Sequence, residues 1–257
     1  FWRNGSRLQM VRDGRRIYAV VPSTDGASYT FVAMNASSFQ MEAALRLEGG
    51  VFSRPYELPD RPKLYVPGGT VFGKLIVHVV EGGNYSIQRS ITFSETGFGW
   101  MGGSGAYPFA YNSRSRMLFV GAADVVLAID TDADVIRRVI HLGDVARAVG
   151  VELVWSCVGG LVYDPRENYL YISHWDRSFV SIYDLTKEQF LPRVVALHGF
   201  GPAHLFANDD GSKIYAVNSR SDNVSVIDVG SKTEEKVIDL HAYLASPEPP
   251  KPALSVS

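Results

Sequence analysis

Histidine and carboxylate side chains, which can carry out acid–base chemistry, gather in one short run of this sequence, His174-Trp175-Asp176-Arg177. A second candidate histidine, His204, lies further along in "LHGFGPAHLF". Two neutral imidazoles that converge can serve as general base and acid, or can bind a metal ion. Asp176 would orient His174 if the loop geometry allows. Because a surface histidine without such a role is the commoner case, His174, His204 and Asp176 stay candidate catalytic residues, and no metal site is predicted.

Aromatic and arginine side chains in the same kind of segment suggest a binding surface. Tryptophan supplies apolar contact area, and a few polar groups orient a bound molecule. The candidates for ligand or partner binding are Trp100, Trp155, Trp175, Arg177 and Arg54. The alternative interpretation is that the large side chains fill space within the protein and bind nothing.

Other motifs that carry chemistry are absent from the sequence. The glycine-rich stretch "GFGWMGGSG" lacks the G-x-x-x-x-G-K-[ST] pattern of a phosphate-binding loop. There is no G-x-S-x-G, H-E-x-x-H or C-x-x-C-H sequence, which argues against α/β-hydrolase, zinc-protease and c-type haem chemistry. Cys157 is the only cysteine, so neither an intrachain disulfide nor a cysteine-based zinc site can form. We therefore predict no cofactor.

Charge and hydropathy restrict the classes of partner. The 257 residues are 46% hydrophobic and carry a formal net charge of −2, so the chain can bury a large core but has no basic surface for nucleic acid. No apolar stretch approaches the roughly 18 residues of a membrane-spanning helix. We predict a protein or glycan partner, or self-association, with no nucleic acid and no membrane-spanning segment.

An internal repeat determines where all these residues lie. A branched apolar residue followed by an aromatic one recurs at separations of 44 to 54 residues, as Ile17-Tyr18, Leu64-Tyr65, Leu118-Phe119, Leu170-Tyr171 and Ile214-Tyr215. Each pair follows a segment rich in the Gly, Pro, Asn, Asp and Ser residues of tight turns. Two further apolar runs follow each pair, and alternation such as "VSVID" predicts strands with one covered face.

Four strands per repeat, which we label A to D, predict an all-β protein. One four-stranded antiparallel sheet cannot bury both faces alone, so five such sheets predict a β-propeller with five blades. The expected blades span approximately residues 7–48, 54–93, 106–142, 159–197 and 202–240, within a propeller of residues 1–245. The stretch "GDVARAVGVEL" (143–153) predicts one short helix. Residues 246–257 are rich in proline and predict a tail or linker.

Two stretches carry a family resemblance. "DDGSKIYAVNSRSDNVSVIDVGSKTEEKVIDL" resembles the YVTN-family β-propeller repeat, with "KIYAVN" in the place of the Tyr-Val-Thr-Asn stretch, and "ENYLYISHWDRSFVSIYDL" is similar. The resemblance implies a propeller of the group that includes surface-layer proteins and lactonase-like enzymes, commonly with seven blades. The five blades therefore close on their own, which is our first expectation, or form part of a larger ring completed by further blades or by a second chain.

Propeller topology assigns the candidate residues to loops. The B–C and D–A loops open on one face, and the A–B and C–D turns on the other. We expect Trp100, Trp155, His204 and Arg54 in D–A loops, and residues 174–177 in the B–C loop of blade four, so that all share one face. On the opposite face, the residues that end the C strands are expected to accept hydrogen bonds from turn amides: Asp130, Asp184 and Asp228.

Asparagine sequons bear on location. Four asparagines lie in N-x-[ST] sequences: Asn4, Asn35, Asn84 and Asn223. Chance would give about one, and Asn35 and Asn84 fall in expected C–D turns, where a glycan has room. This pattern favours glycosylation and an extracellular or cell-surface location, with the periplasm or envelope as second choice.

The sequence leaves two functions open. The first is an exported or cell-surface propeller that acts as a binding or structural scaffold through the face with the D–A and B–C loops. The alternative is a propeller enzyme of lyase, lactonase or dehydrogenase-subunit type with a histidine-containing site at the mouth of the channel. Convergence of His174 and His204 on one solvent-reachable point would favour the enzyme.

Overall fold

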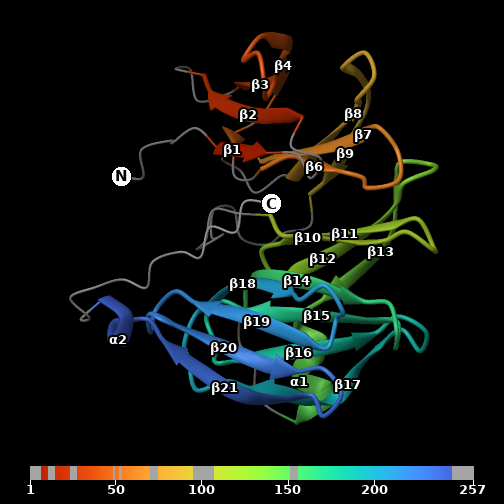
Figure 1. The fold of residues 1–257 in the computed structure, drawn as a ribbon. Coiled ribbons are helices and arrows are strands. Elements are labelled where there is room, and N and C mark those ends of the chain that lie inside the picture. The colour runs from red at the N-terminus through yellow and green to blue at the C-terminus, as the bar shows by residue number, and fades with distance from the viewer. Residues whose placement is uncertain are drawn as a thin grey trace.

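A computed structural model gives the fold of this chain (Figure 1). It describes residues 7–10, 15–23, 28–48, 50–51, 54–69, 75–94, 107–150 and 156–244. The expected tail at residues 246–257 lies outside these ranges, as do Trp100, Trp155 and Asn4.

The strands form five antiparallel sheets that follow one another along the chain. Blade one consists of β1 (Arg7–Met10), β2 (Arg16–Pro22), β3 (Ser28–Asn35) and β4 (Met41–Glu48). Blade two consists of β5 (Gly50–Val51), β6 (Tyr56–Glu57), β7 (Lys63–Gly69), β8 (Leu75–Glu81) and β9 (Ser86–Phe93). In blade two, β5 and β6 both pair with β7 and together take the place of the first strand.

The other three sheets have four strands each. Blade three consists of β10 (Phe109–Asn112), β11 (Met117–Ala122), β12 (Val125–Asp130) and β13 (Val135–His141). Blade four consists of β14 (Val158–Asp164), β15 (Tyr169–His174), β16 (Phe179–Asp184) and β17 (Gln189–Ala196). Blade five consists of β18 (Pro202–Ala207), β19 (Lys213–Asn218), β20 (Asn223–Asp228) and β21 (Thr233–Asp239).

The expected short helix is present, but it is shorter than the sequence pattern. α1 spans Gly143–Val149 between blades three and four and ends at Gly150, whose φ of 71° suits glycine. A second helix, α2 (His241–Leu244), follows blade five.

Hydrophobic cores lie between consecutive blades, and the repeated dipeptide explains how they form. Adjacent residues of a strand point to opposite faces of the sheet. The branched residue of each dipeptide therefore packs on the preceding blade and the aromatic residue on the following one. The pairs that meet in a shared core are Tyr18 with Leu64, Tyr65 with Leu118, Phe119 with Leu170, and Tyr171 with Ile214. All eight side chains are at most 2% exposed.

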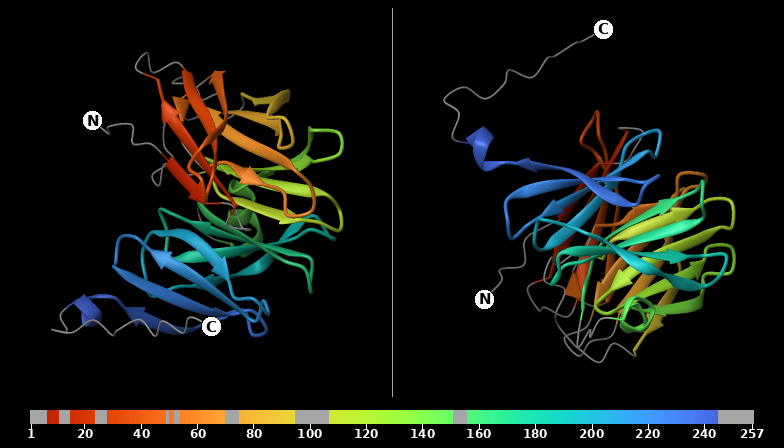
Figure 2. Two further views of the ribbon diagram at one scale, coloured as in Figure 1. Left: turned by 45° about the horizontal axis from the view of Figure 1, so that its top comes forward. Right: turned by 90° about the horizontal axis from the view of Figure 1, so that it is seen from below.

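The blades form an open arc in the part of the chain that the structure describes. The four hydrophobic clusters join blades one and two, two and three, three and four, and four and five, and none of them joins blade five to blade one. Figure 1 and the left view of Figure 2 place blade one at one end of the molecule and blade five at the other. Our first expectation, that five blades close on their own, is not met by these residues.

The C–D turns repeat one geometry and confirm the role expected for the residues that end the C strands. Oδ1 of Asp130 accepts hydrogen bonds from the backbone N–H groups of Asp132 and Ala133, and Oδ1 of Asp184 does so from Thr186 and Lys187. Oδ1 of Asp228 accepts one from Ser231. In all five turns the residue four positions after the end of the C strand has a positive φ of 53° to 59°: Phe39, Tyr85, Asp134, Glu188 and Lys232.

Candidate functional site

The first sequence candidate, His174, lies in a closed network inside blade four. Its Nδ1 lies 2.7 Å from Ser156 Oγ, and its Nε2 lies 2.8 Å from Ser181 Oγ. Ser156 Oγ donates to Asp176 Oδ1 over 3.0 Å, so its proton is not directed at the imidazole. The pattern therefore places the ring proton on Nδ1, leaving Nε2 to accept from the Ser181 hydroxyl.

Burial excludes His174 from contact with a substrate. It is the last residue of β15, not a loop residue, and is 0% exposed. Desolvation lowers the pKa of its imidazole to about 3, so the ring is neutral near pH 7. In blade five, Asn218 takes the equivalent place, where its Nδ2 donates to Ser225 Oγ over 2.7 Å. The network is thus a structural link between strand ends that two successive blades share.

His204 does not approach this network. It lies within β18, not in the D–A loop where the sequence placed it, and its side chain is exposed. Its neighbour Leu205 packs toward blade four, so His204 points to the other face of the sheet, where its ring lies 6.3 Å from that of Phe206. The convergence of His174 and His204 that would have favoured an enzyme is therefore absent.

Asp176 is a structural anchor of the B–C loop of blade four. Its Oδ1 accepts hydrogen bonds from Ser156 Oγ and from the backbone N–H of Cys157, each over 3.0 Å. Its Oδ2 lies 3.2 Å from an amino group of Arg177. These contacts hold the loop that carries Trp175 against the segment that enters blade four. Arg54, the remaining binding candidate in the described residues, is exposed between β5 and β6.

Trp175 belongs to an aromatic and cationic cluster that spans blades four and five. The guanidinium carbon of Arg220 lies 3.9 Å from the centre of the Trp175 ring and 5.4 Å from that of Phe200. Trp175 comes from the B–C loop of blade four, Phe200 from the D–A loop that follows, and Arg220 from the B–C loop of blade five. We call these three residues the loop-face patch. All three segments lie on the face that the sequence assigned to ligand contact.

Backbone hydrogen bonds fix the loops that form the loop-face patch. The N–H of Arg220 donates to the carbonyl of Phe200 over 3.1 Å, and the N–H of Ser219 donates to that of Gly201 over 2.9 Å. The N–H of Phe200 donates to Ser221 Oγ over 2.8 Å. The two loops therefore form one connected unit, which holds the patch in place before any ligand arrives.

Gly201 makes room for the arginine. Its φ is +74°, and a Cβ atom at this position would lie 2.8 Å from Cγ of Arg220. A residue with a side chain would therefore be strained in its backbone and would push Arg220 away from the indole.

The loop-face patch keeps polar and apolar surface available to solvent. Phe200 is 39% exposed, Arg220 is exposed and Trp175 is half-buried. None of the ion pairs formed between described residues involves Arg220. A guanidinium stacked on an aromatic ring retains its N–H edges for a planar anion such as a carboxylate. The patch can thus bind an acidic group beside an apolar one.

Sequence reasoning identified Trp175 and Arg177 but missed Arg220 and Phe200. Both missed residues occupy loops that propeller topology places on the same face, so a survey of every arginine and aromatic residue in those loops would have found them. Their contact with Trp175 depends on how two blades are juxtaposed, which the spacing alone does not give.

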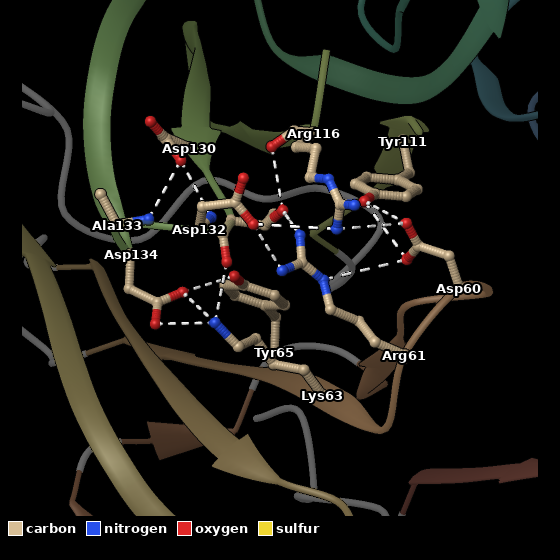
Figure 3. Close-up of polar contacts among 11 residues, drawn as sticks. Asp60, Arg61, Lys63, Tyr65, Tyr111, Arg116, Asp130, Asp132, Ala133 and Asp134 are labelled. Carbon is tan, nitrogen blue, oxygen red and sulfur yellow. Dashed lines mark hydrogen bonds and ion pairs between the residues drawn. The ribbon is translucent and has the colours of Figure 1, made fainter. Parts of the chain in front are cut away.

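The opposite face carries a polar cluster that holds blades two and three together (Figure 3). Lys63 Nζ lies 2.9 Å from Asp134 Oδ2, and Tyr65 donates to Asp134 Oδ1 over 2.6 Å. Arg61 lies 2.6 Å from Asp132 and donates to the Thr131 hydroxyl over 2.5 Å. Opposite charges alternate through the cluster and pair with one another, so it acts as an inter-blade clamp.

A hollow of about 210 Å³ between blades three and four is also bordered by charged side chains that pair with one another. It is lined in part by Arg137 and Arg138, which pair with Asp130 and Glu188. Within the described ranges no group of three or more His, Cys, Asp or Glu side chains is arranged to hold a metal ion. In the same ranges no helix has the length and apolar character needed to cross a membrane.

The predicted sequon sites differ in their surroundings. Asn84 is exposed in the C–D turn of blade two, as expected. Asn35 ends β3, and its Oδ1 accepts hydrogen bonds from the backbone N–H groups of Ser37 and Ser38. Asn223 begins β20, is half-buried, and accepts a hydrogen bond from Asn218 over 2.7 Å.

Five antiparallel sheets in sequence order, four of them four-stranded and one with its first strand divided between β5 and β6, pack face to face and define an all-β protein of the β-propeller class. The fold is similar to that of Kuenenia stuttgartiensis hydrazine synthase, with a TM-score of 0.55 and 17% sequence identity. The similarity covers 74% of this chain and 49% of that one, so this chain spans about half of its neighbour. No protein-family model and no curated protein matches the sequence. At this identity the likeness concerns the fold alone.

Proposed function

We propose that this propeller is a binding scaffold that holds a protein or glycan partner on its D–A and B–C loop face. The loop-face patch carries the proposal, because it combines an arginine that has no carboxylate partner in the described residues with two partly exposed aromatic rings. Trp and Arg are among the residues that contribute most binding energy at protein interfaces. The partner that fits carries a carboxylate or sulfate next to an apolar group.

The rigidity of the patch supports binding over catalysis. Loops tied by backbone hydrogen bonds lose little conformational entropy when a partner binds. The candidate base His174 is fully buried, and His204 lies on another surface. Two histidine–carboxylate pairs, His198 with Glu234 and His241 with Asp222, lie on segments next to the patch in sequence. Neither pair forms a described ion pair or hydrogen bond with Arg220.

A panel of acidic and neutral glycans, together with acidic and amide-capped peptides, tests this proposal. We expect the intact protein to bind acidic members, and Arg220→Ala to weaken that binding by at least tenfold because both the charge and the stacked plane are lost. Arg220→Lys should restore only part of the affinity, since an ammonium group cannot form the same two parallel hydrogen bonds.

The matched control is Arg193→Ala, at an exposed arginine on β17 outside the patch. Removing Arg193 changes the net charge by the same amount, so it separates the specific site from general attraction. Equal affinity of the Arg220→Ala and wild-type proteins, or an equal loss with Arg193→Ala, would count against the patch as the binding site.

We further propose an exported or cell-surface location, with glycans on the exposed C–D turns. The support is the enrichment in sequons and the exposure of Asn84. Mass spectrometry of the native protein before and after enzymatic deglycosylation tests this. We expect a mass loss that decreases by one glycan in Asn84→Gln, and an unchanged mass in the wild-type protein would refute glycosylation.

A further inference from the structure

The hollow of about 210 Å³ between blades three and four arises from two positions that vary among the repeats. The first is the strand-C residue that pairs across the sheet with the aromatic residue of the repeated dipeptide. In blades one to five this residue is Ala33, Val79, Ala128, Ile182 and Val226. In the first four blades it belongs to the core shared with the following blade. Blades one and three thus place only a methyl group where the other blades place a branched side chain.

The second position is the positive-φ residue in the C–D turn of the following blade. Between blades one and two this residue is Tyr85, which is 7% exposed. Its side chain packs in the cluster that contains Ala33, and its hydroxyl donates to Glu42 Oε2 over 2.8 Å. Between blades three and four the residue is Glu188, whose side chain is 55% exposed. Because the carboxylate does not take the place of a ring, the space beside Ala128 becomes the hollow.

The surroundings of Tyr85 and the lining of the hollow correspond position by position. Arg16, Tyr18, Ala33 and Glu42 lie around Tyr85, and strand pairing makes Met117, Phe119, Ala128 and Arg137 their counterparts in the lining. Glu42 and Arg137 are each the extra residue of a β-bulge in strand D. The carboxylate that accepts the tyrosine hydroxyl in blade one is therefore replaced by a guanidinium in blade three.

The charges of the lining favour an anion. The hollow is lined by two arginines, Arg137 and Arg138, and by one carboxylate, Glu188. The bulge allows the two adjacent arginines to border the same hollow, whereas neighbouring side chains of a regular strand point to opposite faces. Asp130 Oδ2 accepts hydrogen bonds from Nε and Nη2 of Arg137 over 3.0 and 2.9 Å. This fixes the guanidinium and leaves its Nη1 without a hydrogen bond to the residues that the structure describes.

We propose that the hollow binds a small aromatic carboxylate. Its ring takes the place that the Tyr85 ring fills between blades one and two, and its carboxylate lies against Arg137 and Arg138. Met117 and Ile140 contribute to an apolar floor for the ring. A cavity of about 150 Å³ holds benzene, so the volume here suits a ring with one substituent. The hollow lies at the C–D turns, on the face opposite the loop-face patch, so this proposal is independent of the proposed binding function.

Titration with benzoate tests the proposal, with carbon-13 methyl resonances of methionine as the readout. We expect binding in the millimolar range, as suits a ligand of this size, with a ring-current shift of Met117. Met41, in blade one and 65% exposed, is the internal control and should not shift. Acetate lacks the ring and benzyl alcohol lacks the charge, so each should bind at least tenfold more weakly. The Met117 response should be unchanged in Arg220→Ala, which separates the hollow from the loop-face patch.

Two substitutions make the test specific. Glu188→Tyr introduces the side chain that blade two uses at this position, where φ is 59° compared with 54° at Tyr85. It should abolish the Met117 response to benzoate and raise the melting temperature. Arg137→Gln should weaken benzoate binding at least tenfold, whereas Arg193→Gln, at an exposed arginine of β17, should leave it unchanged.

Three results would overturn the proposal. These are an unshifted Met117 resonance in the wild-type protein, benzoate binding by Glu188→Tyr at wild-type affinity, and equal losses in Arg137→Gln and Arg193→Gln. Should Glu188→Tyr fold poorly, Ala128→Val fills the hollow with the residue type that blades two and five carry at this position. Wild-type benzoate affinity in a folded Ala128→Val protein would refute the proposal equally.

Discussion

Acid should destabilise this protein through His174 well before its carboxylates protonate. The unfolded chain binds a proton at this imidazole near pH 6.5, whereas desolvation keeps the folded pKa at about 3. Between these values the unfolded state binds more protons, so the contribution of His174 to stability is complete above pH 6.5 and is lost as the pH falls.

The size of the effect follows from the pKa difference. Each pH unit below 6.5 costs about 1.4 kcal/mol, so the free energy of unfolding should fall by about 2 kcal/mol between pH 7.5 and pH 5 on account of His174. His78, whose pKa is also lowered by desolvation, acts in the same direction.

His174→Asn isolates this contribution, because blade five uses Asn218 at the equivalent place with the same type of serine partner. Urea unfolding followed by tryptophan fluorescence from pH 5 to pH 8 is the assay. We expect a weaker pH dependence in His174→Asn, and the wild-type dependence in His204→Asn at an exposed position. If His174→Asn keeps the full acid dependence, the buried histidine is not its source.

Two pairs of substitutions test the site and the inter-blade clamp. Gly201→Ala should lower the free energy of unfolding by about 1 kcal/mol, since φ is positive there and a Cβ would meet Arg220. Gly143→Ala, with no atom near its Cβ, should be neutral in the same thermal unfolding assay. Asp134→Ala should cost about 2 kcal/mol by chemical denaturation, because Asp134 and Lys63 are mostly buried. Asp132→Ala should cost less than about 1 kcal/mol, since that carboxylate is 60% exposed.

The propeller class could be predicted from the sequence because the same pattern of apolar and aromatic residues recurs in every repeat. A branched apolar residue followed by an aromatic one, such as Leu170-Tyr171, recurs in each sheet, since one residue must face each neighbouring blade. The turn aspartates were predictable for a similar reason, because their hydrogen bonds are local.

The site was less predictable because it depends on contacts between blades. The residue types in the run from His174 to Arg177 made His174 and Asp176 candidate catalytic residues, yet strand pairing carries His174 into the interior. The contact of Arg220 with Trp175 joins loops of two blades and needs the glycine at position 201 to allow it. The sequence pattern also does not predict that Phe206 of blade five is exposed. Its exposure depends on how whole blades are arranged, and no described cluster joins blade five to blade one.

The proposed binding function depends most on blades four and five presenting one preassembled patch. Nuclear magnetic resonance of the Arg220 side chain measures this directly, because protons held over an indole ring are shifted upfield. We predict an upfield shift of the Arg220 δ-methylene in the wild-type protein that is lost in Trp175→Ala and kept in Arg177→Ala. An Arg220 signal at the same unshifted position in all three proteins would contradict the patch and the function proposed for it.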